Sequence, residues 1–194
     1  DKVNRPEIRA VKRPEIAKII DRAVRRKHKH RKHRRAHGKK QQIPDIFVDQ
    51  GITRKIKTVS NEDGMNKTIE LASDNFNGLA FINLVDFDAV YGHRRNAAGY
   101  GKAIEEFDVQ LGELINELKN DDLLMVTADH GNDPTYRGTD HTREQVPLII
   151  YSKQFNEMKV LNDGDSFGII GSTICDNFNV KYNGIGSSIL ELLK

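Results

Sequence analysis

LAFINLV at residues 79–85 is a largely apolar run of the kind that forms a buried strand. Beyond it, residues 103–118 place six apolar side chains on one helical stripe, and LLMVT at 123–127 predicts a second strand. The order strand, helix, strand is typical of an α/β protein. A third strand is expected at 146–151, and helices are expected at 65–72 (after Ser60, a cap residue), 167–178 and 187–193. We therefore expect a three-layer fold: a mostly parallel sheet with helices on both faces and ligands beyond the carboxyl ends of its strands.

Charge divides the chain near residue 42. Residues 1–42 carry 17 Lys or Arg against four acidic residues, a net charge of +13, whereas 43–194 carry 14 against 24, a net charge of −10. We expect a basic extension over 1–42, helical or disordered, and an α/β core over 43–194. No apolar run reaches the roughly 20 residues that span a bilayer, and Cys175 is the only cysteine, which excludes an intramolecular disulfide. A cytoplasmic protein without membrane contact is the expectation.

The run KHKHRKH at 27–33 lies in this basic extension. Clustered cations attract nucleic-acid phosphates, and alternating histidines can bind transition metals. We favour a solvated tail, because residues 1–42 contain no aromatic side chain that could stack on a base. A nucleic-acid-binding or tethering role of 1–42 is the second hypothesis. Salt-sensitive retention on DNA or RNA that disappears when 1–42 is deleted would support it.

Three histidines of the core each lie close to an aspartate, after a predicted strand or in the loop beyond it. The candidate ligands are Asp88 and His93 in DFDAVYGHRR (86–95), Asp129 and His130 in ADHGNDP (128–134), and His141 in GTDHTRE (138–144). Glycine and proline in these stretches predict loops rather than helices. Carboxylate and imidazole ligands together suit manganese, iron or zinc. Three clusters are more than one ion requires, so they predict two ions that clamp a phosphoryl group.

Basic residues beside these ligands predict a phosphorylated substrate, because guanidinium forks match phosphate oxygens. The candidates are Arg94, Arg95 and Arg143. For any single histidine, an ordinary polar loop residue is the alternative, and Asp129 could instead bond to backbone amides in a turn. Asp86 is either a ligand or a residue that orients one, and Asp133 and Asp140 are weaker candidates.

Five motifs carry a family resemblance: DIFVDQGIT, SNEDGMNKT, NLVDFDAVYGHRR, TADHGNDP and GTDHTREQVPLIIY. Together they closely resemble the carboxyl-terminal part of bacterial phosphopentomutases, from about residue 43 to the end. ADHG alone indicates only the wider alkaline phosphatase superfamily, which includes cofactor-independent phosphoglycerate mutases. A different phosphatase or mutase of that superfamily is therefore the third hypothesis. The resemblance implies part of an alkaline-phosphatase-like core.

The resemblance also implies roles for the candidate residues. Asp88, His93 and His141 look like ligands of one manganese ion, and Asp129 and His130 look like part of the shell of another. Zn²⁺ and Fe²⁺ suit the same ligands. The family interconverts ribose 1-phosphate and ribose 5-phosphate, and their deoxyribose equivalents, in pentose phosphate and nucleotide metabolism. It does so through a phosphorylated threonine that is primed by a sugar bisphosphate.

The sequence also departs from the family pattern. The family's amino-terminal aspartate ligand, its threonine nucleophile and its sugar-holding cap have no visible counterpart, and Gln42 stands where the family has a lysine. Thr139 and Thr142 do not take the nucleophile's place. We therefore expect weak or no mutase activity from this chain alone, and a partner that supplies the missing half. The change at residue 42 is expected to mark a gene fragment, a fusion or a reading-frame error.

Overall fold

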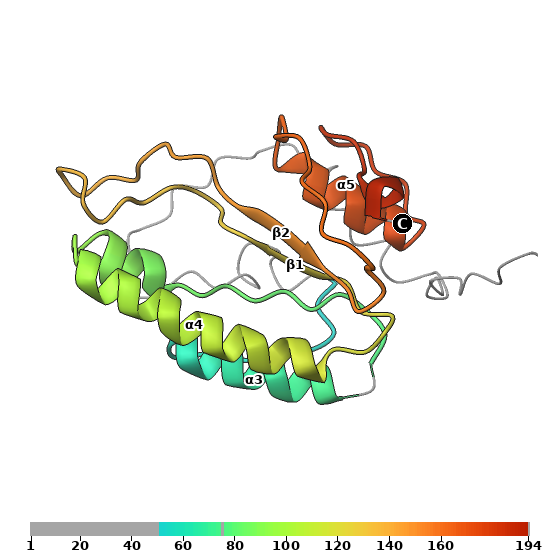
Figure 1. Cartoon of the computed structure of the whole chain (residues 1–194), viewed down its shortest axis with the longest axis horizontal. Coiled ribbons are helices and arrows are strands. Elements are labelled where there is room, and N and C mark those ends of the chain that lie inside the picture. Colours follow the sequence, from blue (N-terminus) through green and yellow to red (C-terminus); the bar gives the residue numbers. More distant parts are fainter. Residues whose placement is uncertain (1–50, 75, 194) are drawn as a thin grey trace, which may run out of the picture. The chain divides into compact units, whose positions relative to one another are not determined.

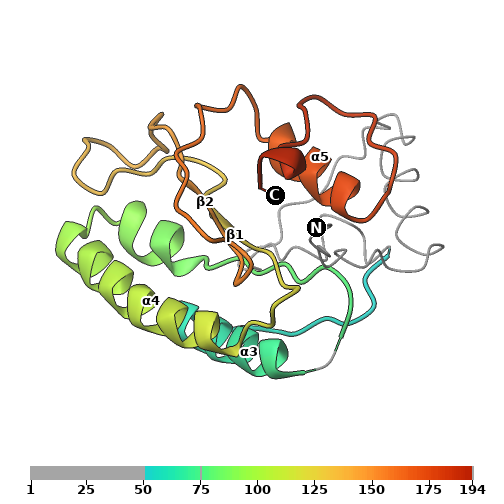
Figure 2. The same cartoon turned by 45° about the vertical axis from the view of Figure 1, so that its right-hand side comes forward.

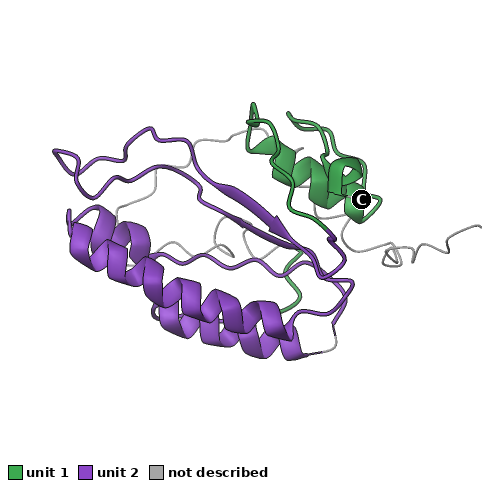
Figure 3. Ribbon diagram, in the orientation of Figure 1, with its two compact units in different colours: residues 1–55, 157–194 green, residues 56–156 purple. Residues whose placement is uncertain are grey.

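The structure is a computed structural model that describes residues 51–74 and 76–193 (Figure 1). The chain divides into two compact units, residues 1–55 with 157–194, and residues 56–156 (Figure 3). The predictions for the basic extension, its boundary at residue 42, Gln42 and the KHKHRKH run lie outside the described residues. Among the residues that the structure describes, no helix is both long and apolar enough to cross a membrane.

Two long helices lie side by side in the unit formed by residues 56–156. They are α3 (Asn61–Ser73) and α4 (Ala97–Glu117), and both views show α3 beside the later part of α4 (Figures 1 and 2). Met65 of α3 is 2% exposed and Leu114 of α4 is 4% exposed, so the contact between the helices forms the core of this unit. Leu114 belongs to the apolar stripe predicted at 103–118, whereas Ile104 at the start of that stripe is 48% exposed.

Both helices begin before the apolar pattern starts. The Ser60 hydroxyl accepts from Asp63 N at 3.1 Å, which confirms the predicted cap and starts α3 at the next residue. Asn96 accepts from Gly99 N at 3.0 Å and starts α4 in the same way. A cap supplies an acceptor for the free N–H groups of the first turn, so a helix extends back to its cap even where its first residues face water.

Two strands form the described sheet. They are β1 (Leu124–Thr127) and β2 (Leu148–Tyr151), which pair antiparallel with Leu124 opposite Tyr151. The strands predicted at 123–127 and 146–151 are confirmed, and they pair antiparallel, whereas a mostly parallel sheet was expected. No helix lies between them to form a crossover, so the chain simply turns back. The buried strand predicted at 79–85 is wrong, because these residues form no strand and Leu79 and Phe81 are 57% and 68% exposed. The described residues do not show a three-layer sheet.

A single turn of π-helix, η1 (Phe87–Gly92), follows the segment 79–85. His93 N donates to Asp88 O at 2.9 Å, a bond between residues five apart, as a π-helix requires. The prediction of a loop is therefore wrong for 87–92. The Phe87 ring packs edge-on against Phe107 of α4, with centroids 6.1 Å apart. This ring contact packs the π-helical turn against α4.

In the other unit, α5 (Gly168–Asn177) confirms the helix predicted at 167–178. The helix predicted at 187–193 is only a short 3₁₀ turn, η2 (Leu190–Leu193). Thr173 on α5 is fully buried, and its hydroxyl accepts from Ile189 N at 3.0 Å. This bond links α5 to the residue that directly precedes η2. Cys175 is a free, buried thiol, and burial raises the pKa of that thiol.

Candidate metal centre

Three segments of residues 56–156 bring the predicted ligands together. The segments supply Asp88 and His93 on η1 and directly after it, His130 after β1, and His141 before β2. Gly131 and Thr142 form an isolated antiparallel bridge, in which Thr142 N donates to Gly131 O at 3.1 Å. The bridge draws the two sides of the loop between the strands together. As a result the rings of His130 and His141 stack, with centroids 3.8 Å apart.

Three donor atoms form a small triangle. Asp88 Oδ1 lies 3.4 Å from His93 Nε2 and 3.3 Å from His141 Nε2, and the two nitrogens are 3.1 Å apart. Ligand atoms held about 2.1 Å from one ion stand roughly 3.0 Å apart in an octahedron and roughly 3.4 Å apart in a tetrahedron. The triangle therefore has the dimensions of one face of a metal coordination shell.

The π-helical turn explains why Asp88 and His93 meet. In an α-helix, residues five apart point roughly 140° away from each other, because each residue advances the helix by about 100°. The wider π turn instead brings such residues onto one face. The five-residue spacing in the sequence thus becomes a ligand pair only because the turn is π-helical.

A backbone carbonyl sets the tautomer of His93. Its Nδ1 lies 2.6 Å from the carbonyl oxygen of Thr139, and a carbonyl can only accept, so Nδ1 carries the proton of the neutral ring. Nε2 then directs a lone pair into the triangle, as metal-binding imidazoles do. His130 has the same arrangement, because its Nδ1 donates to Gly131 O at 3.2 Å.

His130 lies beside the triangle. One donor atom each from His130, Asp88 and His141 can be chosen so that all three lie within 4.8 Å of one another. Asp129 Oδ1 is 3.6 Å from His130 Nε2, and the Asp129 side chain is 80% exposed. The structure thus brings the predicted residues into one cluster, while the division of these residues between two ions stays a prediction.

Asn132 is a site residue that the sequence reasoning missed. Its Nδ2 donates to Asp88 Oδ1 at 2.7 Å, and its Oδ1 accepts from Arg95 Nη1 at 2.8 Å. The carboxylate can only accept and the guanidinium can only donate, so the amide has one orientation. Its signal in the sequence was weak, because an asparagine beside a glycine is an ordinary turn residue.

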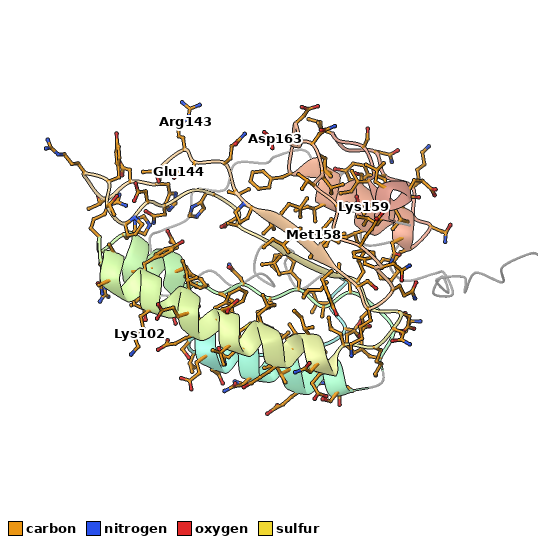
Figure 4. All side chains as sticks on the ribbon, viewed as in Figure 1. Lys102, Arg143, Glu144, Met158, Lys159 and Asp163 are labelled. Atoms are coloured by element: carbon orange, nitrogen blue, oxygen red, sulfur yellow. The ribbon has the colours of Figure 1, made fainter. Side chains whose placement is uncertain are left out.

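The three predicted phosphate-binding arginines have different surroundings. Arg94 is exposed, and Arg143 is exposed and points away from the ribbon (Figure 4). Arg95 is half-buried, and it donates hydrogen bonds to four protein oxygens. Arg94 and Arg143 therefore present their guanidinium groups to solvent, whereas Arg95 faces the loops that carry the ligands.

The weaker carboxylate candidates bond to nearby chain segments. Asp86 Oδ2 accepts from Asn61 N at 2.8 Å, and Asp86 N donates to Asn61 Oδ1 at 2.9 Å, so Asp86 ties η1 to the start of α3. Asp133 accepts from the backbone N–H and the hydroxyl of Thr135, and these bonds hold the pKa of Asp133 below its usual value. The backbone carbonyl of Asp140 accepts from Arg95.

The cluster is open on one side. The Asp88, His93 and His141 side chains are 33%, 38% and 46% exposed, so a ligand can reach their donor atoms. Burial, and then the charge of Asp88, raise the pKa of the Tyr100 hydroxyl. A carboxylate and imidazoles that converge in this way suit a divalent cation with coordination positions left for substrate or water.

Comparisons with known proteins agree with this geometry. The family model of the Metalloenzyme superfamily matches residues 19–182. The chain is 53% identical over 153 residues to a phosphopentomutase of Clostridium beijerinckii, and 54% identical over 153 residues to phosphopentomutases of Agathobacter rectalis and Clostridium botulinum. Each match covers 78% of this chain and 39% of the relative, so the chain spans about two fifths of the length of these relatives.

The family match includes every candidate ligand and the whole described cluster. The similarity to phosphopentomutases extends over most of the same residues. The chain therefore belongs to the Metalloenzyme superfamily, and within it is similar to the phosphopentomutases.

Proposed function

We propose that this chain provides the metal-binding part of a phosphopentomutase and binds two Mn²⁺ ions. Asp88, His93 and His141 are the ligands of the first ion, and Asp129 with His130 contributes to the shell of the second. The observation that carries the proposal is the triangle of donor atoms, whose edges of 3.1 to 3.4 Å match a coordination shell.

The proposed substrate is a phosphorylated pentose, ribose or deoxyribose 1-phosphate and 5-phosphate. Metal ions bound here would neutralise the phosphoryl oxygens during in-line transfer. The chain's own residues hold the donor atoms in place and fix the protons on Nδ1 of His93 and His130. Exposed Arg94 and Arg143 contribute charge for the substrate phosphate.

Several finer points belong to the same proposal. The complete catalytic domain is a three-layer, mostly parallel α/β sheet, with residues 43–194 as its metal-binding part and residues 1–42 as a separate extension. The threonine nucleophile, the remaining aspartate ligand and the sugar-binding cap come from outside the described residues. A sugar bisphosphate primes the reaction, which takes place in the cytoplasm.

Isothermal titration of the 194-residue chain with MnCl₂ tests the metal site. We expect His93→Ala, His141→Ala and Asp88→Asn to abolish binding of the first ion, because each removes one corner of the triangle. Asp108→Asn, an exposed carboxylate on α4, is the charge-matched control and should bind as wild type does. Unchanged titrations for both histidine variants would falsify the assignment.

A substrate panel tests the reaction class. Ribose 5-phosphate, 3-phosphoglycerate and a simple phosphomonoester are each incubated with the Mn²⁺-loaded chain. We expect ribose 5-phosphate to bind and to be turned over weakly or not at all by this chain alone. Preferential binding of phosphoglycerate, or release of phosphate from the monoester, would instead favour another enzyme type of the same superfamily.

A further inference from the structure

The side chain of Arg95 connects all three segments of the candidate metal centre. Its Nε donates to Gly138 O at 2.5 Å, and its Nη2 donates to Asp140 O at 2.6 Å. Its Nη1 donates to Asp133 O at 2.7 Å and to Asn132 Oδ1 at 2.8 Å. Four of the five N–H groups of the guanidinium are therefore used within the protein.

The acceptors of these bonds lie next to the metal-binding residues. Asp140 directly precedes His141. Asn132, whose Oδ1 accepts from Arg95, also donates from Nδ2 to Asp88 Oδ1 at 2.7 Å. The carbonyl that orients His93 belongs to Thr139, between the two loop carbonyls that Arg95 binds. One side chain thus holds the 138–141 loop, the loop after β1 and, through Asn132, the carboxylate on η1.

We propose that Arg95 is a positioning residue that sets the distances between Asp88, His93 and His141, in place of the phosphate contact expected from the sequence. The proposal rests on the metal site described under Proposed function. With one N–H left, Arg95 has little capacity for the bidentate grip that a phosphate requires.

Two further features support this role. Arg95 has φ of +52°, a left-handed conformation that residues other than glycine rarely adopt and that persists where the surroundings determine it. The planar guanidinium also reaches acceptors in several directions from one rigid plane, whereas a lysine ammonium concentrates its donors at a single point. Lysine therefore cannot reproduce the four contacts.

Titration of the full chain with Mn²⁺ tests the proposal. We expect Arg95→Ala to weaken binding about 10- to 100-fold, as loss of residues that orient metal ligands does. Arg95→Lys should recover only a small part of this loss, although it keeps the charge. Arg137→Ala removes an equal charge from an exposed position in the same loop and should bind as wild type does. Wild-type affinity of Arg95→Ala would overturn the proposal.

A spectroscopic measurement separates positioning from a general loss of stability. Co²⁺ bound to wild type and to Arg95→Lys is compared by visible absorption, and we expect a shifted or weakened band in the variant because the ligand geometry changes. An identical spectrum at saturating Co²⁺ would contradict the proposal. If Arg95→Ala does not fold, as judged by circular dichroism in EDTA, the Mn²⁺ affinity and the Co²⁺ spectrum of Arg95→Lys decide the outcome.

A double-mutant cycle tests the route through Asn132. If Arg95 acts on Asp88 through that amide, the losses of Mn²⁺ affinity in Arg95→Lys and Asn132→Ala should be less than additive when combined. Fully additive losses would exclude this route.

The variants distinguish failure of the proposed role of Arg95 from failure of the metal site itself. If His93→Ala and His141→Ala bind Mn²⁺ normally, the proposed function fails. If they lose binding while Arg95→Lys keeps both affinity and spectrum, only the role of Arg95 fails. An Arg95 variant with normal Mn²⁺ affinity but weaker binding of ribose 5-phosphate would show instead that Arg95 binds the substrate phosphate.

Discussion

The amide of Asn132 is confined between a carboxylate and a guanidinium, and a glycine makes room for it. A Cβ built on Gly92 would lie 2.7 Å from Asn132 Cγ and 3.1 Å from Phe87 O. A methyl group there must therefore displace the amide that holds Asp88. Glycine at position 92 is required by this close approach.

Gly92→Ala should consequently weaken Mn²⁺ binding by roughly tenfold or more, the effect of disturbing residues that orient metal ligands. Gly101→Ala on α4 is the matched control, because a Cβ there meets no atom within 4 Å. That control should bind Mn²⁺ normally and should raise the free energy of unfolding by about 0.5–1 kcal/mol, as glycine replacement in a helix does. Calorimetric titration and urea unfolding measure both effects. Normal binding by Gly92→Ala would show that Asn132 can move without cost to the site.

Tyr100 gives the metal-free protein a pH dependence. Burial, and then the charge of Asp88, raise the pKa of the Tyr100 hydroxyl above its ordinary value of 10.0. The unfolded chain therefore releases this proton at lower pH than the folded chain does. The stabilising contribution of Tyr100 is complete below pH 10 and is lost as the pH rises through the folded pKa.

We expect the free energy of unfolding in EDTA to fall above pH 10 more steeply in wild type than in Tyr100→Phe. Urea unfolding at pH 8 and at pH 10.5 measures the difference, with Tyr136→Phe, at an exposed side chain, as the control. Equal slopes in wild type and Tyr100→Phe would contradict the direction of the pKa shift.

At the scale of elements, the start of α3 is tied both to its own chain and to η1. Ser60 Oγ accepts from Asp63 N at 3.1 Å, and Asp63 Oδ2 accepts in return from Val59 N at 2.9 Å. The second bond comes from the residue before the cap, so the pair resembles a capping box displaced by one residue. Directly after it, Asn61 exchanges hydrogen bonds with Asp86, so the cap also anchors the chain just before the ligand-bearing turn.

Ser60→Ala should lower the free energy of unfolding by about 1 kcal/mol, because it leaves an N–H of the first turn of α3 without its acceptor. Ser60→Asn keeps an acceptor at the cap and should remain within a few tenths of a kcal/mol of wild type, roughly the spread among good caps. Thermal and urea unfolding compare the three proteins. If Ser60→Asn lowers the free energy of unfolding as much as Ser60→Ala does, the lost stability does not come from the cap hydrogen bond.

At the scale of the whole molecule, the proposed metal site would couple ion binding to folding. The candidate ligands come from three segments, so they are brought together only when residues 56–156 fold. A cation that binds the folded chain alone at 100 times its dissociation constant stabilises it by about 2.7 kcal/mol.

We therefore expect saturating Mn²⁺ to raise the midpoint of thermal unfolding by roughly 5–10 °C, from the usual entropy of unfolding of a chain of this size. EDTA should reverse the increase, and His141→Ala should show none. Differential scanning calorimetry with and without Mn²⁺ measures this. An equal increase in His141→Ala would place the stabilising ion elsewhere on the molecule.

The sequence by itself determined the α/β class, the helices around residues 65–72, 103–118 and 167–178, and two strands. It did so because apolar periodicity and caps are local properties of the chain. It also identified Asp88, His93, His130 and His141 as candidate ligands, because carboxylates and imidazoles cluster after apolar runs. The antiparallel pairing of β1 with β2 was missed, because strand direction depends on how the intervening chain folds back and not on either strand.

Only the tertiary structure decided which residues hold those ligands in place. The π-helical turn depends on packing against α4, and it alone brings the side chains of Asp88 and His93 onto one face. Arg95 lies near Asn132 and the carbonyls of the 138–140 loop only in the folded chain, where the loop between β1 and β2 lies against the segment between η1 and α4. Contacts between residues some 40 positions apart leave no periodic signal in the chain, because their geometry is set by the fold around them.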